Sequence, residues 1–102
     1  MIFVIASLEL QSGTREAFLA EFDKVLEHVL TENGCIEYVP AVDAETGIGS
    51  QFKIGPDRVT IIEKWASVDA LMAHDSAPHM QAFRARVKEY VRGREILILT
   101  PA

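Results

Sequence analysis

Residues 61–83 read IIEKWASVDALMAHDSAPHMQAF, a β-branched strand followed by an interrupted helical segment. The strand ends in Trp65, the only tryptophan of the chain, and Ser67 is a predicted helix N-cap with an acidic residue in the next turn. His74 and His79 lie on either side of a Ser-Ala-Pro break. This combination predicts a small aromatic-lined pocket beside a proton-handling group. The alternative is that Trp65 closes a core and both histidines lie on the surface.

The N-terminal part of the chain predicts a strand, a helix and a second strand. Ile2–Leu10 alternates in hydropathy, with apolar residues on both faces near its start. A helix is predicted from Thr14 to about Glu32, because apolar residues recur every three or four positions, and Asn33-Gly34 ends it. The second strand is predicted over Cys35–Val42. Pro40 cannot donate to a ladder, so this strand lies at an edge or is broken.

The C-terminal part predicts two more strands around the interrupted helix. Residues 44–57 contain three glycines and a proline and are predicted to be mostly loop, with a short extra strand over Gln51–Ile54. Arg58–Trp65 is the third strand of the main sheet. Ser67 to about Arg92 is predicted to be helical apart from the break, and a glycine then ends the helix. Glu95–Leu99 is the predicted final strand.

The order of elements is β-α-β-β-α-β. It predicts a single α+β domain over residues 1–102 with the ferredoxin-like fold, a four-stranded antiparallel sheet with both helices on one face. The strands are apolar on both sides around Phe3–Ile5 and Thr60–Ile62. A second copy of the chain is the simplest cover for the other face, so we expect a homodimer joined through the sheets.

Composition excludes several classes of partner. The chain has 102 residues and a net charge of −5, so a nucleic-acid partner, which needs a basic face, is not expected. The segment Met1–Leu10 has no basic flank and carries polar residues, which predicts neither a signal peptide nor a membrane span. A single cysteine, Cys35, cannot form an intramolecular disulfide. We therefore expect a cytoplasmic protein in which Cys35 is a buried structural residue.

Several short motifs, taken in order, give the chain a family resemblance. They are the run from Glu32 to Tyr38 (ENGCIEY), then Glu63-Lys64-Trp65, and then Ala77-Pro78-His79-Met80. The chain resembles the antibiotic biosynthesis monooxygenase (ABM) family over nearly its whole length, and within it the small bacterial quinol monooxygenases. This resemblance implies a dimeric α/β barrel with a pocket between sheet and helices in each subunit. It also implies oxygenation of a small aromatic quinol or phenol by O₂ without metal, flavin or haem.

The family is functionally mixed, which leaves other readings open. One alternative is a small-molecule isomerase or signal-degrading enzyme, and another is a non-catalytic ligand-binding dimer. Haem degradation is disfavoured. Haem-degrading relatives have an Asn, a Trp and an axial His where this chain has Ser7, His74 and Arg84.

Oxygenation without a cofactor requires a bound aromatic, a base and a dry place for O₂. His74 is the first candidate for the base; alternatively it bonds exposed carbonyls at a helix end. His79 either faces the pocket or caps the second helical segment, whereas His28 is expected to be solvated. Glu63 is a second candidate proton acceptor, or else an interfacial carboxylate paired with an arginine.

The predicted substrate-binding residues are aromatic or apolar. Trp65 is either a stacking wall of the pocket or part of a dimer core, because a period of two cannot choose between the faces of a strand. Tyr38 could orient the substrate through its hydroxyl or be an ordinary strand tyrosine. Phe83 and Met80 line the pocket or belong to the core. No metal site is predicted, since His74 and His79, five residues apart, do not share a helix face.

Overall fold

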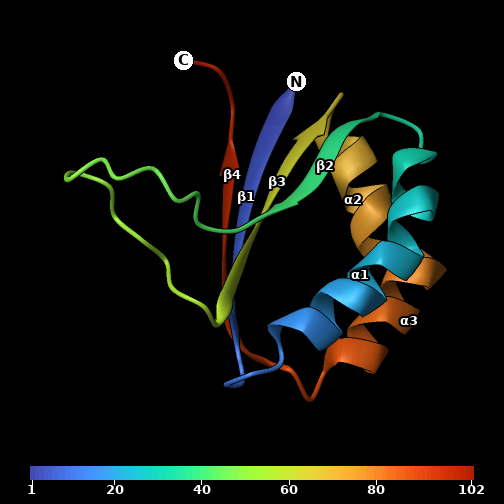
Figure 1. Ribbon diagram of the computed structural model, residues 1–102. Helices are drawn as coiled ribbons and strands as arrows, with labels where there is room; N and C mark the ends of the chain where they lie inside the picture. Colours follow the sequence, from blue (N-terminus) through green and yellow to red (C-terminus); the bar gives the residue numbers. More distant parts are fainter.

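The computed structural model describes all residues from 1 to 102 and has the predicted ferredoxin-like α+β fold. The sheet has the strand order β2-β3-β1-β4, and every neighbouring pair is antiparallel. All helices lie on one side of the sheet (Figure 1). The elements are β1 (Ile2–Leu10), α1 (Arg15–Leu30), β2 (Cys35–Ala41), β3 (Arg58–Trp65), α2 (Val68–Ser76), α3 (Pro78–Val87) and β4 (Val91–Leu99).

The core lies between the sheet and the helices. On β1 and β3 every second residue is buried, so one face of each strand packs against the helices. The apolar stripe of α1 packs onto that face, as its spacing predicts. The fully buried large side chains are Trp65, Phe18, Phe22, Leu10, Val29 and Val59.

The break between α2 and α3 occurs where the sequence predicts it. The Ser67 hydroxyl accepts the Ala70 N–H at 3.1 Å and caps the start of α2. Ala77 has extended backbone angles, and Pro78 occupies the first turn of α3, where its missing N–H costs nothing. His74 therefore lies in the last turn of α2, and His79 lies in the first turn of α3.

Two predicted boundaries are wrong. The helix ends at Val87, and β4 begins at Val91 rather than Glu95. The chain turns at Tyr90, whose N–H donates to the carbonyl of Val87, and Val91 already pairs with Leu10. Tyr90 and Val91 continue the apolar spacing of the helix but belong to a turn and to β4, because pairing with β1 outweighs local periodicity.

The extra strand expected over Gln51–Ile54 does not form. Residues 42–57 instead make an irregular arm, which extends away from the helices in the view of Figure 1. The Asp43 carboxylate accepts the N–H groups of Ile54 and Gly55 at 2.8 Å each, and these two bonds lower the pKa of Asp43. These N–H groups therefore bond to a side chain and not to a neighbouring strand. Phe52, near the end of the arm, is 88% exposed.

The uncovered face of the sheet is apolar in part. Val39, Leu97 and Leu99 are each more than two-fifths exposed, and Ile5 and Ile62 lie between them as partners on β1 and β3. Among the helices, none combines the length and hydrophobicity that crossing a membrane requires.

Candidate functional site

An open cavity of about 1100 Å³ lies between the paired helices α2 and α3 and the inner face of the sheet. It exists because the helices cover β2 and β3 but leave the inner face of β4 bare. Ile96 and Ile98 pair with the buried Ala6 and Val4, yet they are 46% and 58% exposed. Most of the lining is apolar, which suits an aromatic ligand.

Five of the seven predicted site residues line this cavity: Tyr38, Glu63, His74, Met80 and Phe83. Trp65 does not, because its indole is fully buried behind them. Its strand face meets the helices, so it is neither a cavity wall nor part of a face that another subunit could cover. His79 lies outside the cavity as well, beside a smaller surface depression that it shares with His28.

Glu63 is a buried carboxyl group with a shifted pKa. The indole N–H of Trp65 donates to its Oε1 at 2.9 Å. Glu63 is 5% exposed and lies on the face of β3 that meets the helices, so the interfacial alternative is wrong. Burial raises the pKa of Glu63 to about 7. The bond from Trp65 opposes this rise in pKa, and the negative charges of Glu32 and Asp75 add to it. The group can therefore exchange a proton near neutral pH.

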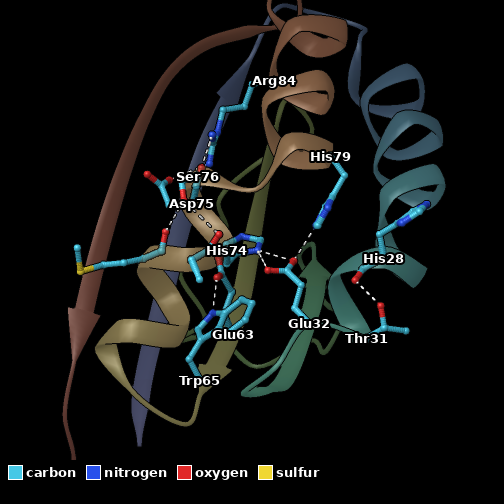
Figure 2. Close-up of polar contacts among 12 residues, drawn as sticks. His28, Thr31, Glu32, Glu63, Trp65, His74, Asp75, Ser76, His79 and Arg84 are labelled. Atoms are coloured by element: carbon cyan, nitrogen blue, oxygen red, sulfur yellow. Dashed lines mark hydrogen bonds and ion pairs between the residues drawn. The ribbon is translucent and has the colours of Figure 1, made fainter.

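His74 is held on one side by a carboxylate and on the other by aromatic rings. Its Nδ1 lies 2.9 Å from Oε2 and 3.2 Å from Oε1 of Glu32. The ring centroid is 4.6 Å from that of Trp65 and 5.2 Å from that of Tyr38. Its polar partner is thus a carboxylate and not the helix-end carbonyls of the alternative reading. Figure 2 shows His74 between Trp65 and Glu32.

His79 meets the same carboxylate from the outside. Its Nε2 lies 2.9 Å from Oε2 of Glu32, and its side chain is 27% exposed. Its ring is stacked at 5.6 Å on the ring of His28, which is exposed as predicted. His79 therefore neither faces the cavity nor caps α3; it reaches back to the end of α1 (Figure 2).

The Tyr38 hydroxyl is free to act on a ligand. The side chain is 4% exposed, and its ring stacks on that of Phe22 with centroids 5.4 Å apart. Burial, followed by the charges of Glu63 and Glu32, raises the pKa of Tyr38. The hydroxyl makes no hydrogen bond within the chain, and no fully buried side-chain oxygen lacks a partner, so the hydroxyl is accessible. A protonated phenol open to the cavity can donate a hydrogen bond.

Sequence reasoning missed three polar residues of the site. Glu32 follows α1 and is not among the predicted site residues, although it binds two histidines that come more than forty residues later. Arg84 and Asp75, at the cavity wall, form a salt bridge at 2.8 Å. A charged residue directly before an Asn-Gly turn was the only local signal for Glu32, and none existed for the other two.

Cys35 is half-buried, and burial raises the pKa of its thiol, which disfavours the reactive thiolate. The chain has no group of three or more His, Cys, Asp or Glu side chains arranged to hold a metal ion.

Comparison with known proteins identifies the family. A family model described as antibiotic biosynthesis monooxygenase matches residues 1–86. A protein of Escherichia coli K12 named "Probable quinol monooxygenase YgiN" is 40% identical over 103 aligned positions, which cover 99% of this chain and 98% of that protein.

Solved structures share the fold at lower identity. A conserved protein from Methanosarcina mazei superposes with a TM-score of 0.83 at 22% identity, covering 99% of this chain and 92% of the other. Rv0793 from Mycobacterium tuberculosis gives 0.79 at 25% identity, with 99% and 94% covered. The match to the family model over most of the chain, together with the full-length relative, shows that this protein belongs to the antibiotic biosynthesis monooxygenase family.

Proposed function

We propose that the protein is a monooxygenase that uses O₂ to oxidise a small aromatic quinol or phenol without a cofactor. One observation carries this proposal: two proton-handling groups, Glu63 and His74, share an apolar cavity with the aromatic side chains of Tyr38 and Phe83. The name of the full-length relative supports the same reaction and substrate class.

The reaction would insert one oxygen atom into the ring and reduce the other to water. A quinol and O₂ give a hydroxyquinone and water, so the four electrons lost by the ring are those gained by O₂. Triplet O₂ reacts slowly with a closed-shell quinol. An anionic quinolate, however, can pass it one electron, and the resulting semiquinone and superoxide can combine at a ring carbon. Removal of the quinol proton is therefore the step that the protein must catalyse first.

His74 is the proposed base, and Glu63 is the proposed acid. The free nitrogen of His74 accepts the proton of one quinol hydroxyl. After oxygen adds to the ring carbon as a peroxide anion, the O–O bond breaks while that carbon releases its hydrogen as a proton. The departing oxygen needs two protons to leave as water. One is the proton that His74 took from the quinol, and Glu63, whose pKa is about 7 and which is partly protonated at neutral pH, can supply the other. The proton released by the ring carbon then restores Glu63.

The remaining walls would bind the substrate. Phe83 and Met80 provide apolar contacts, and the free hydroxyl of Tyr38 donates to a substrate oxygen. Trp65 acts from behind, by bonding Glu63 and packing on His74. Oxygen uptake by chelator-treated protein with a panel of quinols and phenols tests the proposal. Uptake above the non-enzymatic rate is expected for at least one quinol, and no uptake with any of them would contradict it.

An isomerase acting on a small carbonyl compound is the second candidate. The specific observation in its favour is the same pair, because Glu63 and His74 could move a proton between two carbons without O₂. Exchange of substrate hydrogen with deuterated water in the absence of oxygen would distinguish this activity from oxygenation.

We also propose that two chains pair through their uncovered sheet faces. The supporting observations are the exposed apolar side chains of β2 and β4, and the arm, which carries the exposed Ile48 and Phe52. Burial of this apolar surface would supply the driving force for association.

A further inference from the structure

Glu32 is the one acidic side chain of the site that does not face the cavity. It lies just after α1, its side chain is 13% exposed, and both of its partners are imidazoles. Neither a lysine nor an arginine lies within salt-bridge distance of it. The carboxylate therefore joins the end of α1 to the last turn of α2 and to the first turn of α3 (Figure 2).

This arrangement fixes where the hydrogen of each ring must be. An ionised carboxylate can only accept hydrogen bonds, so the nitrogen that faces it on each ring must carry a hydrogen. His74 then bears its hydrogen on Nδ1, and His79 bears one on Nε2. A neutral His74 ring held in this way has an unprotonated Nε2. Neutral histidine in water prefers the opposite tautomer, with the hydrogen on Nε2.

The free nitrogen of His74 is open to the cavity. Every fully buried side-chain nitrogen and oxygen of the protein has a hydrogen-bond partner. Nε2 of His74 has no partner within the chain, so it is not fully buried. Because His74 lines the cavity, Nε2 is accessible there. Rotation of the ring is restricted by Trp65 and Tyr38, whose rings pack against it. Only the tautomer that Glu32 selects presents a lone pair to a ligand.

His79 completes the arrangement from the solvent side. Its N–H binds the same Oε2 atom that His74 binds, so the carboxylate is held between the two rings. A largely buried carboxylate that loses one of its hydrogen-bond partners is held less firmly in place. His79 thus acts on the cavity through Glu32, without touching a ligand.

We propose that Glu32 and His79 are positioning residues that hold neutral His74 as the Nδ1–H tautomer and so make its Nε2 the proton acceptor of the cavity. This inference deepens the proposed function and rests on it for the activity measurements. The tautomer itself can be measured without any turnover.

The experiment is ¹⁵N NMR of the histidine rings at about pH 8, where an unperturbed imidazole is neutral. The His74 signals are assigned by their loss in His74→Ala. Their two-bond couplings to ring hydrogens show which nitrogen carries the hydrogen. The native protein is expected to show a protonated Nδ1 and an unprotonated Nε2. In Glu32→Ala the His74 ring is expected to shift towards the Nε2–H form, while Glu27→Ala, which removes an exposed carboxylate of α1, leaves it unchanged.

A second pair of variants tests His79. The amide of Gln places an N–H near the position of the histidine Nε2, so His79→Gln is expected to restore most of what His79→Ala loses, in both tautomer and turnover. With an active quinol, Glu32→Ala is expected to lower kcat by roughly 10²-fold, the scale of a lost general base, with a smaller change in KM.

Three results would overturn the inference: an Nε2–H tautomer in the native protein, an unchanged tautomer in Glu32→Ala, or a changed tautomer with full turnover. If no quinol is consumed, the proposed function fails, yet the NMR result still decides whether Glu32 sets the tautomer.

Discussion

The indole N–H of Trp65 donates to Oε1 of Glu63 at 2.9 Å, two residues away on the same strand face. The two side chains point the same way because alternate residues of a strand share a face. The bond lets a buried carboxyl group keep a polar partner inside an apolar layer. It does not cancel the cost of burial, so the pKa of Glu63 stays near 7, against an ordinary value of 4.5.

This shift makes stability depend on pH. Between about pH 4.5 and 7, folded Glu63 holds a proton that the unfolded chain releases. The contribution of protonated Glu63 to the free energy of unfolding is therefore complete below about pH 4.5 and is lost as pH rises through about 7. The free energy of unfolding falls by about 3 kcal/mol over this range. In urea unfolding, the native protein should lose this free energy relative to Glu63→Gln between about pH 4 and pH 8. A constant difference between the two proteins would contradict the shift.

The rate of oxygenation should also depend on Glu63. If its protonated form supplies the proton for O–O cleavage, turnover falls as pH rises above about 7. Glu63→Gln should lower the maximal rate and remove this alkaline limb. The check is the pH profile of kcat for both proteins with one quinol. An alkaline limb that persists unchanged in Glu63→Gln would contradict the assignment of Glu63 as the acid.

His74→Ala should lower turnover by roughly 10²-fold or more, the usual effect of losing a general base. Substrate binding should change less, because Phe83 and Met80 remain in the cavity wall. Glu27→Ala is the control, since Glu27 is exposed and does not line the cavity. Steady-state kinetics on the three proteins make the test; near-normal turnover in His74→Ala would remove the assignment.

Gly34 positions the segment that carries Glu32. Its φ is +86°, and an added Cβ would lie 2.6 Å from the Cβ of Ala70 in α2. Gly47 has a φ of +71°, and no atom lies within 4 Å of a Cβ added there. Gly47→Ala therefore measures the cost of the backbone conformation without a steric contact. Gly47→Ala should cost about 1 kcal/mol from strain alone. Gly34→Ala should cost roughly 2 kcal/mol more, because the contact adds overpacking. Equal losses in urea unfolding would mean that α2 yields freely.

The proposed dimer can be tested by substitutions on the uncovered face of the sheet. Leu97, on β4, is 56% exposed, and Leu30, on the helical side, is 51% exposed. Sedimentation of the native chain should give a species of twice 11.3 kDa at micromolar concentration. Leu97→Glu should yield the monomer, whereas Leu30→Glu should not. A native monomer would exclude the dimer.

Periodicity was sufficient to predict the layers of this fold. The alternation in Ile2–Leu10 and the stripe of α1 depend on local spacing, and so does the break before Pro78. The start of β4 could not be predicted in this way, because Val91 joins a strand by pairing with Leu10, 81 residues earlier in the sequence. The irregular backbone of residues 44–57 was predictable from its glycines and proline. The hydrogen bonds from the N–H groups of Ile54 and Gly55 to the Asp43 side chain, which stand in place of the extra strand, were not.

The residue types of the site were predictable from the sequence, but the contacts between them were not. A strand pattern cannot say which face meets the helices, so the position of Trp65 behind the cavity needed the structure. Glu32 was missed because a carboxylate at a helix end is usually solvated. Its role depends on two imidazoles that only the tertiary fold brings to it.

The most direct test of the central claim is the fate of the oxygen atoms in a reaction with ¹⁸O₂ and an active quinol. The chelator-treated native protein should place one ¹⁸O atom in the hydroxyquinone and the other in water, and His74→Ala should do so at least roughly 10²-fold more slowly. A product without ¹⁸O, or hydrogen peroxide formed in proportion to the quinol consumed, would contradict oxygenation in this cavity.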